Sequence, residues 1–124
     1  SVNINNVIVS GPKGSLANVS SSVVSAAIKL VPGVFALHQN YPNPFNPNTE
    51  IRFDIPEATK INISIFNLMG QKVKTLSNEK ITPGYHTINW DGTNDKGVQV
   101  STGMYFYTLQ TDTKSAMKKM LFLK

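Results

Sequence analysis

The sequence predicts an all-β fold, an immunoglobulin-like antiparallel β-sandwich of about seven strands. β-branched and aromatic residues alternate with polar ones through most of the chain, and Gly, Pro, Asn and Asp divide these runs at short intervals. Helical periodicity is nearly absent. The chain has no cysteine, so the Cys-Trp-Cys signature of antibody domains is missing.

Residues 51–55 predict a strand, because three large apolar residues alternate with charged ones. Pro56 ends this strand, since proline lacks the amide hydrogen that a sheet ladder needs. Residues 57–59 make a short connection, and residues 61–65 repeat the alternation with isoleucine at every second position. These runs are expected to be consecutive strands, each with one buried face.

A tight hairpin is predicted at residues 67–71, with Gly70 at the position that requires a positive φ. Residues 72–76 then return as a strand with Val73 on one face. A second turn is expected at residues 82–84, whose sequence is Thr-Pro-Gly.

The second half of the chain continues the same alternation. Residues 85–90 predict a strand that presents Ile88 and Trp90 to one face. A long polar turn with two glycines follows. Residues 98–102 are expected to be extended and to break at Gly103.

Two strands close the chain. Residues 104–111 predict a strand with Tyr105, Tyr107 and Leu109 on one face. After a turn at 112–114, residues 115–124 predict the last strand. Its apolar run leaves two choices for the inward face, Met120 with Phe122 or Leu121 with Leu123.

Residues 1–36 differ from the rest of the chain. Two extended apolar runs, at 2–9 and 23–31, are separated by a Pro-Gly turn, and Pro32 closes the second. Two strands cannot bury a core by themselves. We therefore expect this segment to be the tail of an upstream β domain, similar to the last strands of a cohesin-like domain, or a strand-donating linker. Residues 37–124 are expected to form the sandwich.

Composition excludes several classes of function. The net charge is +5, but Arg52 is the only arginine and the lysines are scattered except near the C-terminus, which argues against nucleic-acid binding. Without cysteine, no disulfide, thiol nucleophile or cysteine metal site can form. No apolar run approaches the roughly 18 residues of a membrane span. Because the chain starts at Ser1 without a signal peptide, we expect a mature product or a fragment.

No catalytic constellation is evident. His38 and His86 lack a Ser or Asp partner at any motif spacing, and the carboxylates are spread singly along the chain. Asp91 and Asp95 are the candidates for a calcium site, but their loop lacks the EF-hand order of ligands and contains Lys96. Turns held by Asx hydrogen bonds are the preferred interpretation, so no cofactor is expected.

A cluster of aromatic residues allows a carbohydrate-stacking platform as an alternative. Its members are Trp90, Tyr105, Phe106 and Tyr107. Because these residues lie in alternating strands, packing in the core and at its edge is the preferred interpretation.

A proline-rich segment precedes the first strand, with prolines at Pro42, Pro44 and Pro47. Each proline fixes its own φ and biases the preceding residue toward extended geometry. Residues 41–46 therefore cannot be helical and are expected to form a stiff, polyproline-like lead-in that gives Tyr41 and Phe45 fixed directions.

This segment is similar to the opening of the type A C-terminal sorting domain carried by cargo of the bacterial type IX secretion system. The pattern Leu-x-Gln-Asn-Tyr-Pro-Asn-Pro-Phe-Asn-Pro is matched at residues 37–47. The match continues through Trp-Asp-Gly at 90–92 and Lys-Lys-Met at 118–120 to the end of the chain. Some flagellar hook-capping proteins carry a similar immunoglobulin-like module but lack the proline-rich opening.

The resemblance implies a non-catalytic domain that directs an exported cargo across the outer membrane. Its implied partners are the outer-membrane type IX translocon and a cell-surface sorting peptidase that cuts near residues 31–39. The implied location is the periplasm in transit and then the cell surface or the extracellular space. The expected recognition residues are Tyr41, Pro42, Pro44, Phe45, Pro47, Lys118, Lys119, Met120 and Lys124.

The last strand is also expected to offer a free edge that a receptor captures through backbone pairing. Two rival interpretations stay open. One rival is an extracellular structural subunit that polymerises by donating its N-terminal strands. The other is a carbohydrate-binding accessory module.

Overall fold

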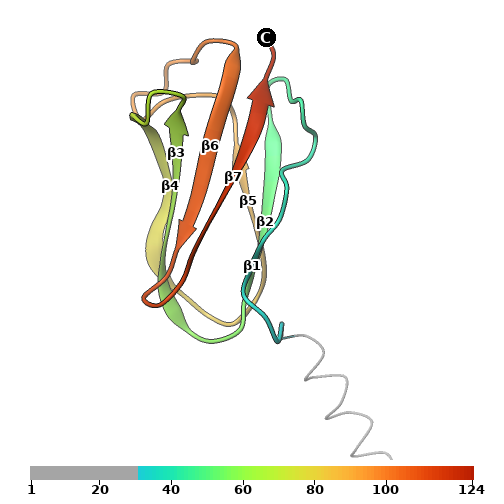
Figure 1. The fold of residues 1–124 in the computed structure, drawn as a ribbon, viewed down its shortest axis with the longest axis vertical. Coiled ribbons are helices and arrows are strands. Elements are labelled where there is room, and N and C mark those ends of the chain that lie inside the picture. The colour runs from blue at the N-terminus through green and yellow to red at the C-terminus, as the bar shows by residue number, and fades with distance from the viewer. Residues whose placement is uncertain (1–30) are drawn as a thin grey trace, which may run out of the picture. The chain divides into compact units, whose positions relative to one another are not determined.

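Seven antiparallel strands in two sheets make up residues 31–124, the part of the chain that this computed structural model describes (Figure 1). The strands are β1 (Ala36–Leu37), β2 (Thr49–Ile55), β3 (Thr59–Asn67), β4 (Lys72–Ile81), β5 (Gly84–Trp90), β6 (Gly103–Gln110) and β7 (Ser115–Phe122). One sheet has the order β1-β2-β5 and the other β4-β3-β6-β7. The predicted all-β, immunoglobulin-like sandwich is confirmed.

Pro32–Lys124 forms one compact unit. The apolar runs predicted at 2–9 and 23–31 lie outside the described residues, apart from Val31. The division predicted between residues 36 and 37 and the strand-donating role of the N-terminal segment therefore stay predictions.

The core forms where the alternating residues of the two sheets meet. Each strand has one buried face because successive side chains point to opposite sides of a sheet. The side chains with less than two per cent exposure include Ile51, Ile55, Ile61, Ile63, Ile65, Trp90, Tyr107 and Leu109. The faces predicted for these strands are confirmed.

The last strand buries Met120 and Phe122, which resolves the choice that the sequence left open. Met120 pairs with Tyr105 of β6, and Phe122 pairs with Gly103. Since directly paired residues share a face, this register directs both side chains into the core. Leu123 is 42% exposed.

Residues 98–102, expected to be extended, do not join a strand of either sheet. Within this stretch, Gln99 forms an isolated β-bridge with Thr93, and the next strand, β6, begins at Gly103. The reason is local hydrogen bonding: the Asn94 side chain accepts from the Val98 amide (3.0 Å), and the Val100 amide donates to the Gly92 carbonyl (2.9 Å). These loop contacts satisfy groups that a strand would have used in a ladder.

A tyrosine corner stabilises the start of β6. The Tyr105 hydroxyl donates to the Ser101 carbonyl, four residues upstream. Immunoglobulin-like sandwiches use the same arrangement at the corresponding strand. No local pattern indicates this bond, because a tyrosine in a strand has the same sequence surroundings with or without it.

Two glycines of the loop between β5 and β6 allow a matched test. Gly92 and Gly97 have φ of 77° and 78°, but a Cβ at Gly92 would lie 3.1 Å from Phe122 Cζ, whereas nothing lies within 4 Å at Gly97. Gly97→Ala is expected to lower the free energy of unfolding by about 1–2 kcal/mol through backbone strain alone. Gly92→Ala should cost a further 1–3 kcal/mol, roughly, from overpacking. Chemical denaturation of both variants checks this, and equal losses would contradict the Phe122 contact.

Candidate functional site

The proline-rich segment folds back instead of leading straight into the sheet. Tyr41 and Glu50 exchange two backbone hydrogen bonds of 2.9 and 2.8 Å, so residues 41 and 50 are neighbours. The peptide bonds before Pro42, Pro44 and Pro47 are cis. The segment is not helical, as predicted, but the expected polyproline-like rod is wrong, because a chain that returns to its own start cannot stay extended.

Phe45 is the point at which this segment joins the core. Its amide donates to the Leu121 carbonyl and its carbonyl accepts from the Leu123 amide, both at 3.0 Å. Its ring stacks on Phe122, with centroids 4.9 Å apart, and lies 5.5 Å from Trp90. With 1% of its surface exposed, Phe45 is a core residue and not part of the surface that a receptor meets.

Two side chains extend the contact along the outer edge of β7. Asn43 Oδ1 accepts from the Leu121 amide (3.0 Å), and Gln39 Nε2 donates to the Lys119 carbonyl (2.8 Å). We call residues 39–45 the edge clamp, because they occupy the backbone groups that β7 turns away from β6. The prediction that a receptor captures this edge by backbone pairing is wrong for this part of β7, since the groups already have partners.

A buried polar network fixes the edge clamp to the sandwich. The Tyr107 hydroxyl accepts from the Asn40 amide (2.8 Å) and donates to the His38 carbonyl (2.7 Å). The Asn40 side chain donates to Thr49 Oγ1 (2.9 Å), which donates in turn to the Pro42 carbonyl (2.9 Å). Asn40 and Thr49 are almost fully buried, and these bonds satisfy them.

Burial raises the pKa of Tyr107 from its ordinary 10.0 to about 12, against the opposing effect of the Asn40 amide. A raised pKa in the fold means that this residue's stabilising effect is complete below pH 10 and is lost as the pH rises through 12. We expect the thermal midpoint of unfolding to decrease as the pH rises from 10 to 12. The decrease should be smaller in the Tyr107→Phe variant. Tyr85→Phe, at a residue that is 61% exposed, is the control. An unchanged pH profile in Tyr107→Phe would contradict this role.

The other predicted recognition residues differ in how much of their surface is exposed. Tyr41 is 78% exposed, and its neighbours Pro42, Pro44 and Pro47 are exposed as well. Lys119 and Lys124 are exposed, Lys118 is half-buried and Met120 is buried. The proline-rich loop and the C-terminus lie at the same end of the sandwich (Figure 1).

One pair of titratable side chains was missed in the sequence. His38 Nε2 lies 2.9 Å from Asp54 Oδ2, because His38 follows β1 and β1 pairs with β2. Sixteen positions separate the two residues, so no local motif brings them together. Within residues 31–124, His38 makes no side-chain bond to a hydroxyl. His86 stacks on Phe53 and lies 2.8 Å from the Thr82 carbonyl, so it has a structural position.

Asp91 and Asp95 hold turns and edges. Asp91 accepts from the hydroxyl and the amide of Thr93, and the hydroxyl bond lowers the pKa of Asp91. Asp95 accepts from the Thr75 amide of β4 (3.1 Å). In the described part of the chain, no three His, Asp or Glu side chains lie close enough together to hold a metal ion.

The proposed carbohydrate platform is wrong. Trp90, Tyr105 and Tyr107 are buried, and the Trp90 indole donates to the Thr93 carbonyl (2.8 Å). Phe106 is half-buried on the opposite face of β6, so the rings do not form one exposed surface.

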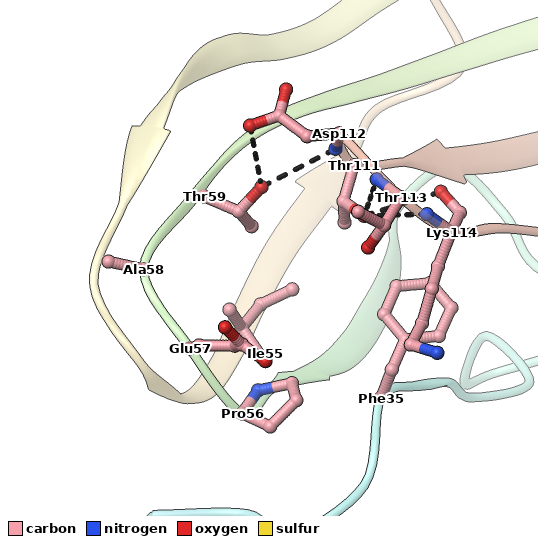
Figure 2. A pocket seen from close by; sticks show the side chains of 10 residues that line it. All are labelled: Phe35, Ile55, Pro56, Glu57, Ala58, Thr59, Thr111, Asp112, Thr113 and Lys114. Atoms are coloured by element: carbon pink, nitrogen blue, oxygen red, sulfur yellow. Dashed lines mark hydrogen bonds between the residues drawn. The ribbon is translucent and has the colours of Figure 1, made fainter.

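A pocket lies at the other end of the sandwich, where the chain enters from residue 31. Figure 2 shows Phe35 beside the β2–β3 connection, with Pro56 and Glu57, and the β6–β7 turn, with Asp112 and Lys114. The turn is held by bonds within it and by Thr59, whose hydroxyl lies 3.4 Å from Asp112 Oδ2. Phe35 itself packs against the core, so the residue just before β1 is part of the sandwich.

Solved structures resemble this fold. Dimeric latent PorU from Porphyromonas gingivalis is 21% identical with a TM-score of 0.58, over 75% of this chain and 10% of that chain. This chain thus spans a tenth of PorU. FlgD from Xanthomonas campestris, described in connection with flagellar hook capping, is 28% identical with a TM-score of 0.50, over 79% of this chain and 72% of that chain.

No curated protein sequence matches the chain significantly. Within residues 31–124, no helix is long and apolar enough to cross a bilayer. The model of the family described as secretion system C-terminal sorting domain matches residues 39–123, from the first residue of the edge clamp almost to the end of the chain. Because this match covers more than half of the sequence, the chain belongs to the family of secretion system C-terminal sorting domains.

Proposed function

We propose that this chain is a non-catalytic sorting domain that directs an exported cargo across the outer membrane through the type IX translocon. The observation that carries the proposal is the double use of the proline-rich motif. Its Gln39, Asn43 and Phe45 bond to β7 and the residue that follows it, and its Asn40 bonds to Tyr107 of β6, whereas Tyr41 and the three prolines stay exposed. A motif of this kind both closes the fold and offers a rigid surface.

The position of this surface suits a sorting role. Residues 33–35 lie beside the β2–β3 connection and Lys114, and the proline-rich loop lies at the opposite end of the sandwich (Figure 1). A receptor at the loop therefore meets the exposed Tyr41 side chain together with the exposed Lys119 and Lys124. Lysine ammonium groups and a tyrosine ring suit a polar rim around an aromatic anchor. The expected route is the periplasm and then the cell surface or the extracellular space.

The absence of catalysis is part of the proposal. It is supported by the structural use of His38, His86, Asp91 and Asp95 within the described residues. We propose likewise that the domain works without a cofactor. Thermal unfolding with and without calcium tests this proposal. A calcium ion bound at Asp91 and Asp95 would raise the midpoint of unfolding.

The sorting peptidase is expected to cut before Ala36. Ala36 and Leu37 pair with Asp54 and Phe53 of β2, and Leu37 is 6% exposed, so a protease cannot bind this stretch in extended form. Val34, by contrast, is 73% exposed. N-terminal sequencing of the released domain checks this: a first residue at Ala36 or earlier is predicted, and one beyond Ala36 would contradict the protection by β1.

Two exposed tyrosines give a matched test of recognition. The chain is fused to a periplasmic reporter in a host with the type IX system, and the reporter outside the cell is measured. Tyr41→Ser is expected to reduce export strongly, whereas Tyr85→Ser should not, and neither should change stability beyond about 0.5 kcal/mol because both side chains are exposed. Equal export of the two variants would show that the loop is not the recognised surface.

Self-association through the N-terminal strands stays a prediction. Residues 1–30 lie outside the described part of the chain, so neither the polymerising role nor the cohesin-like origin of that segment gains support. Sedimentation at two concentrations distinguishes a monomeric sorting domain from a polymer.

A further inference from the structure

Every charged strand residue that the register assigns to the outer face of the four-stranded sheet is a lysine. The register of β3, β6 and β7 assigns every second residue to this face, and two register shifts in β4 place Lys80, Asn78, Thr75 and Lys72 on it. Its large or charged members are Lys60, Lys72, Lys80, Lys119, Phe66, Phe106, Met104, Met117 and Leu121. The other strand residues on this face are Ser, Thr, Asn and Gln. We call it the lysine-flanked face.

One cross-strand row forms the centre of this face. Lys72 of β4 pairs with Phe66 of β3, Phe66 pairs with Phe106 of β6, and Phe106 pairs with Lys119 of β7. Two phenyl rings thus lie between two ammonium groups, all within one line across the sheet. The pair Met104 with Leu121 lies beside this row and widens the apolar strip.

The strip is shallow. Phe66 and Phe106 are half-buried among their neighbours, and Met117, two residues before Lys119, is 63% exposed. Such a strip can be covered by another protein surface, and half-buried rings offer less apolar area for insertion among acyl chains than exposed rings would. Methionine is flexible and polarisable, so Met104 and Met117 can adapt to partners of different shape.

The positive charge of this face limits the kind of partner that can cover it. A second copy of this face would place lysines against lysines, which disfavours an isologous dimer. Residues 1–30 of this chain contain Lys13 and Lys29 and no Asp or Glu, so they do not complement the face either. A partner with carboxylates spaced around apolar side chains complements both the strip and its flanks.

We propose that the lysine-flanked face docks an acidic segment of a protein partner. Its carboxylates pair with Lys72 and Lys119, and its apolar side chains cover Phe66, Phe106 and Met117. This surface shares Lys119 with the surface proposed around Tyr41 but is centred on Phe66 and Phe106, and the inference does not depend on the export route.

The test uses the full chain and NMR. The ¹⁵N-labelled protein is titrated with a short synthetic peptide in which Glu and Leu alternate, with the Lys and Leu counterpart, and with phosphatidylglycerol vesicles. We expect the acidic peptide to shift amides of β3, β6 and β7 around Phe106. The double variant Lys72→Glu/Lys119→Glu should bind it about tenfold more weakly.

A charge-matched control keeps the result specific. Lys96→Glu/Lys114→Glu changes two exposed loop lysines outside this face and should bind the acidic peptide as the native chain does. Equal binding of both peptides, shifts on another surface, or shifts of this face with vesicles alone would each overturn the proposal. Because the readout is binding, a failure here is independent of the result of any export assay.

Discussion

Removal of residues 118–124 is expected to unfold the sandwich. The deletion takes away Met120 and Phe122, which are 1% and 0% exposed, and it leaves the Phe45 ring without its stacking partner. Loss of each large buried side chain costs about 3–5 kcal/mol, and small domains have only about 5–15 kcal/mol of stability in total. Circular dichroism and one-dimensional NMR of the truncated chain check this result.

Removal of Lys124 alone is the control, because its side chain is exposed. This shorter deletion should keep a cooperative transition near the native midpoint. A truncated chain that lacks residues 118–124 and still unfolds cooperatively would show that β7 is dispensable for the fold. If the prediction holds, export assays on tail deletions report folding, and Lys119→Ala and Lys124→Ala are the appropriate variants for recognition.

Phe45→Ala is expected to lower the free energy of unfolding by about 3–5 kcal/mol, as for other buried aromatic residues. The loss removes the contacts with Phe122 and Trp90 at the end of the core. Because the ring anchors the edge clamp, the amides of Leu121 and Leu123 should also exchange faster with solvent.

Hydrogen exchange and denaturant titration check the two parts of this prediction. Tyr41→Ala lies in the same loop at a side chain that is 78% exposed, and it should change stability by no more than about 0.5 kcal/mol. Faster exchange at Leu121 without loss of stability, or loss of stability without faster exchange, would contradict the coupling between the Phe45 ring and the β7 edge.

The strands were predictable because apolar and polar residues alternate in a strand that has one buried face. Ile51, Phe53 and Ile55 are buried as their alternation with charged residues required. β7 was ambiguous at its end, since four consecutive residues from Met120 are apolar and alternation is lost. Only the pairing with β6 selects Met120 and Phe122.

The candidate site was predictable in composition but not in contacts. The prolines excluded a helix at residues 41–46, which the structure confirms. The bonds that matter most join positions far apart, with 78 positions between Asn43 and Leu121 and 67 between Asn40 and Tyr107. No local pattern encodes such pairs, so Phe45 was expected among the recognition residues although it lies in the core.

The most direct measurement is the amount of a reporter outside the cell when it is fused to the whole chain, in a host with and without a functional type IX translocon. We predict that the reporter leaves the cell only when the translocon functions. Retention of the reporter in the periplasm of both hosts, or equal release from both, would contradict a sorting role for this domain.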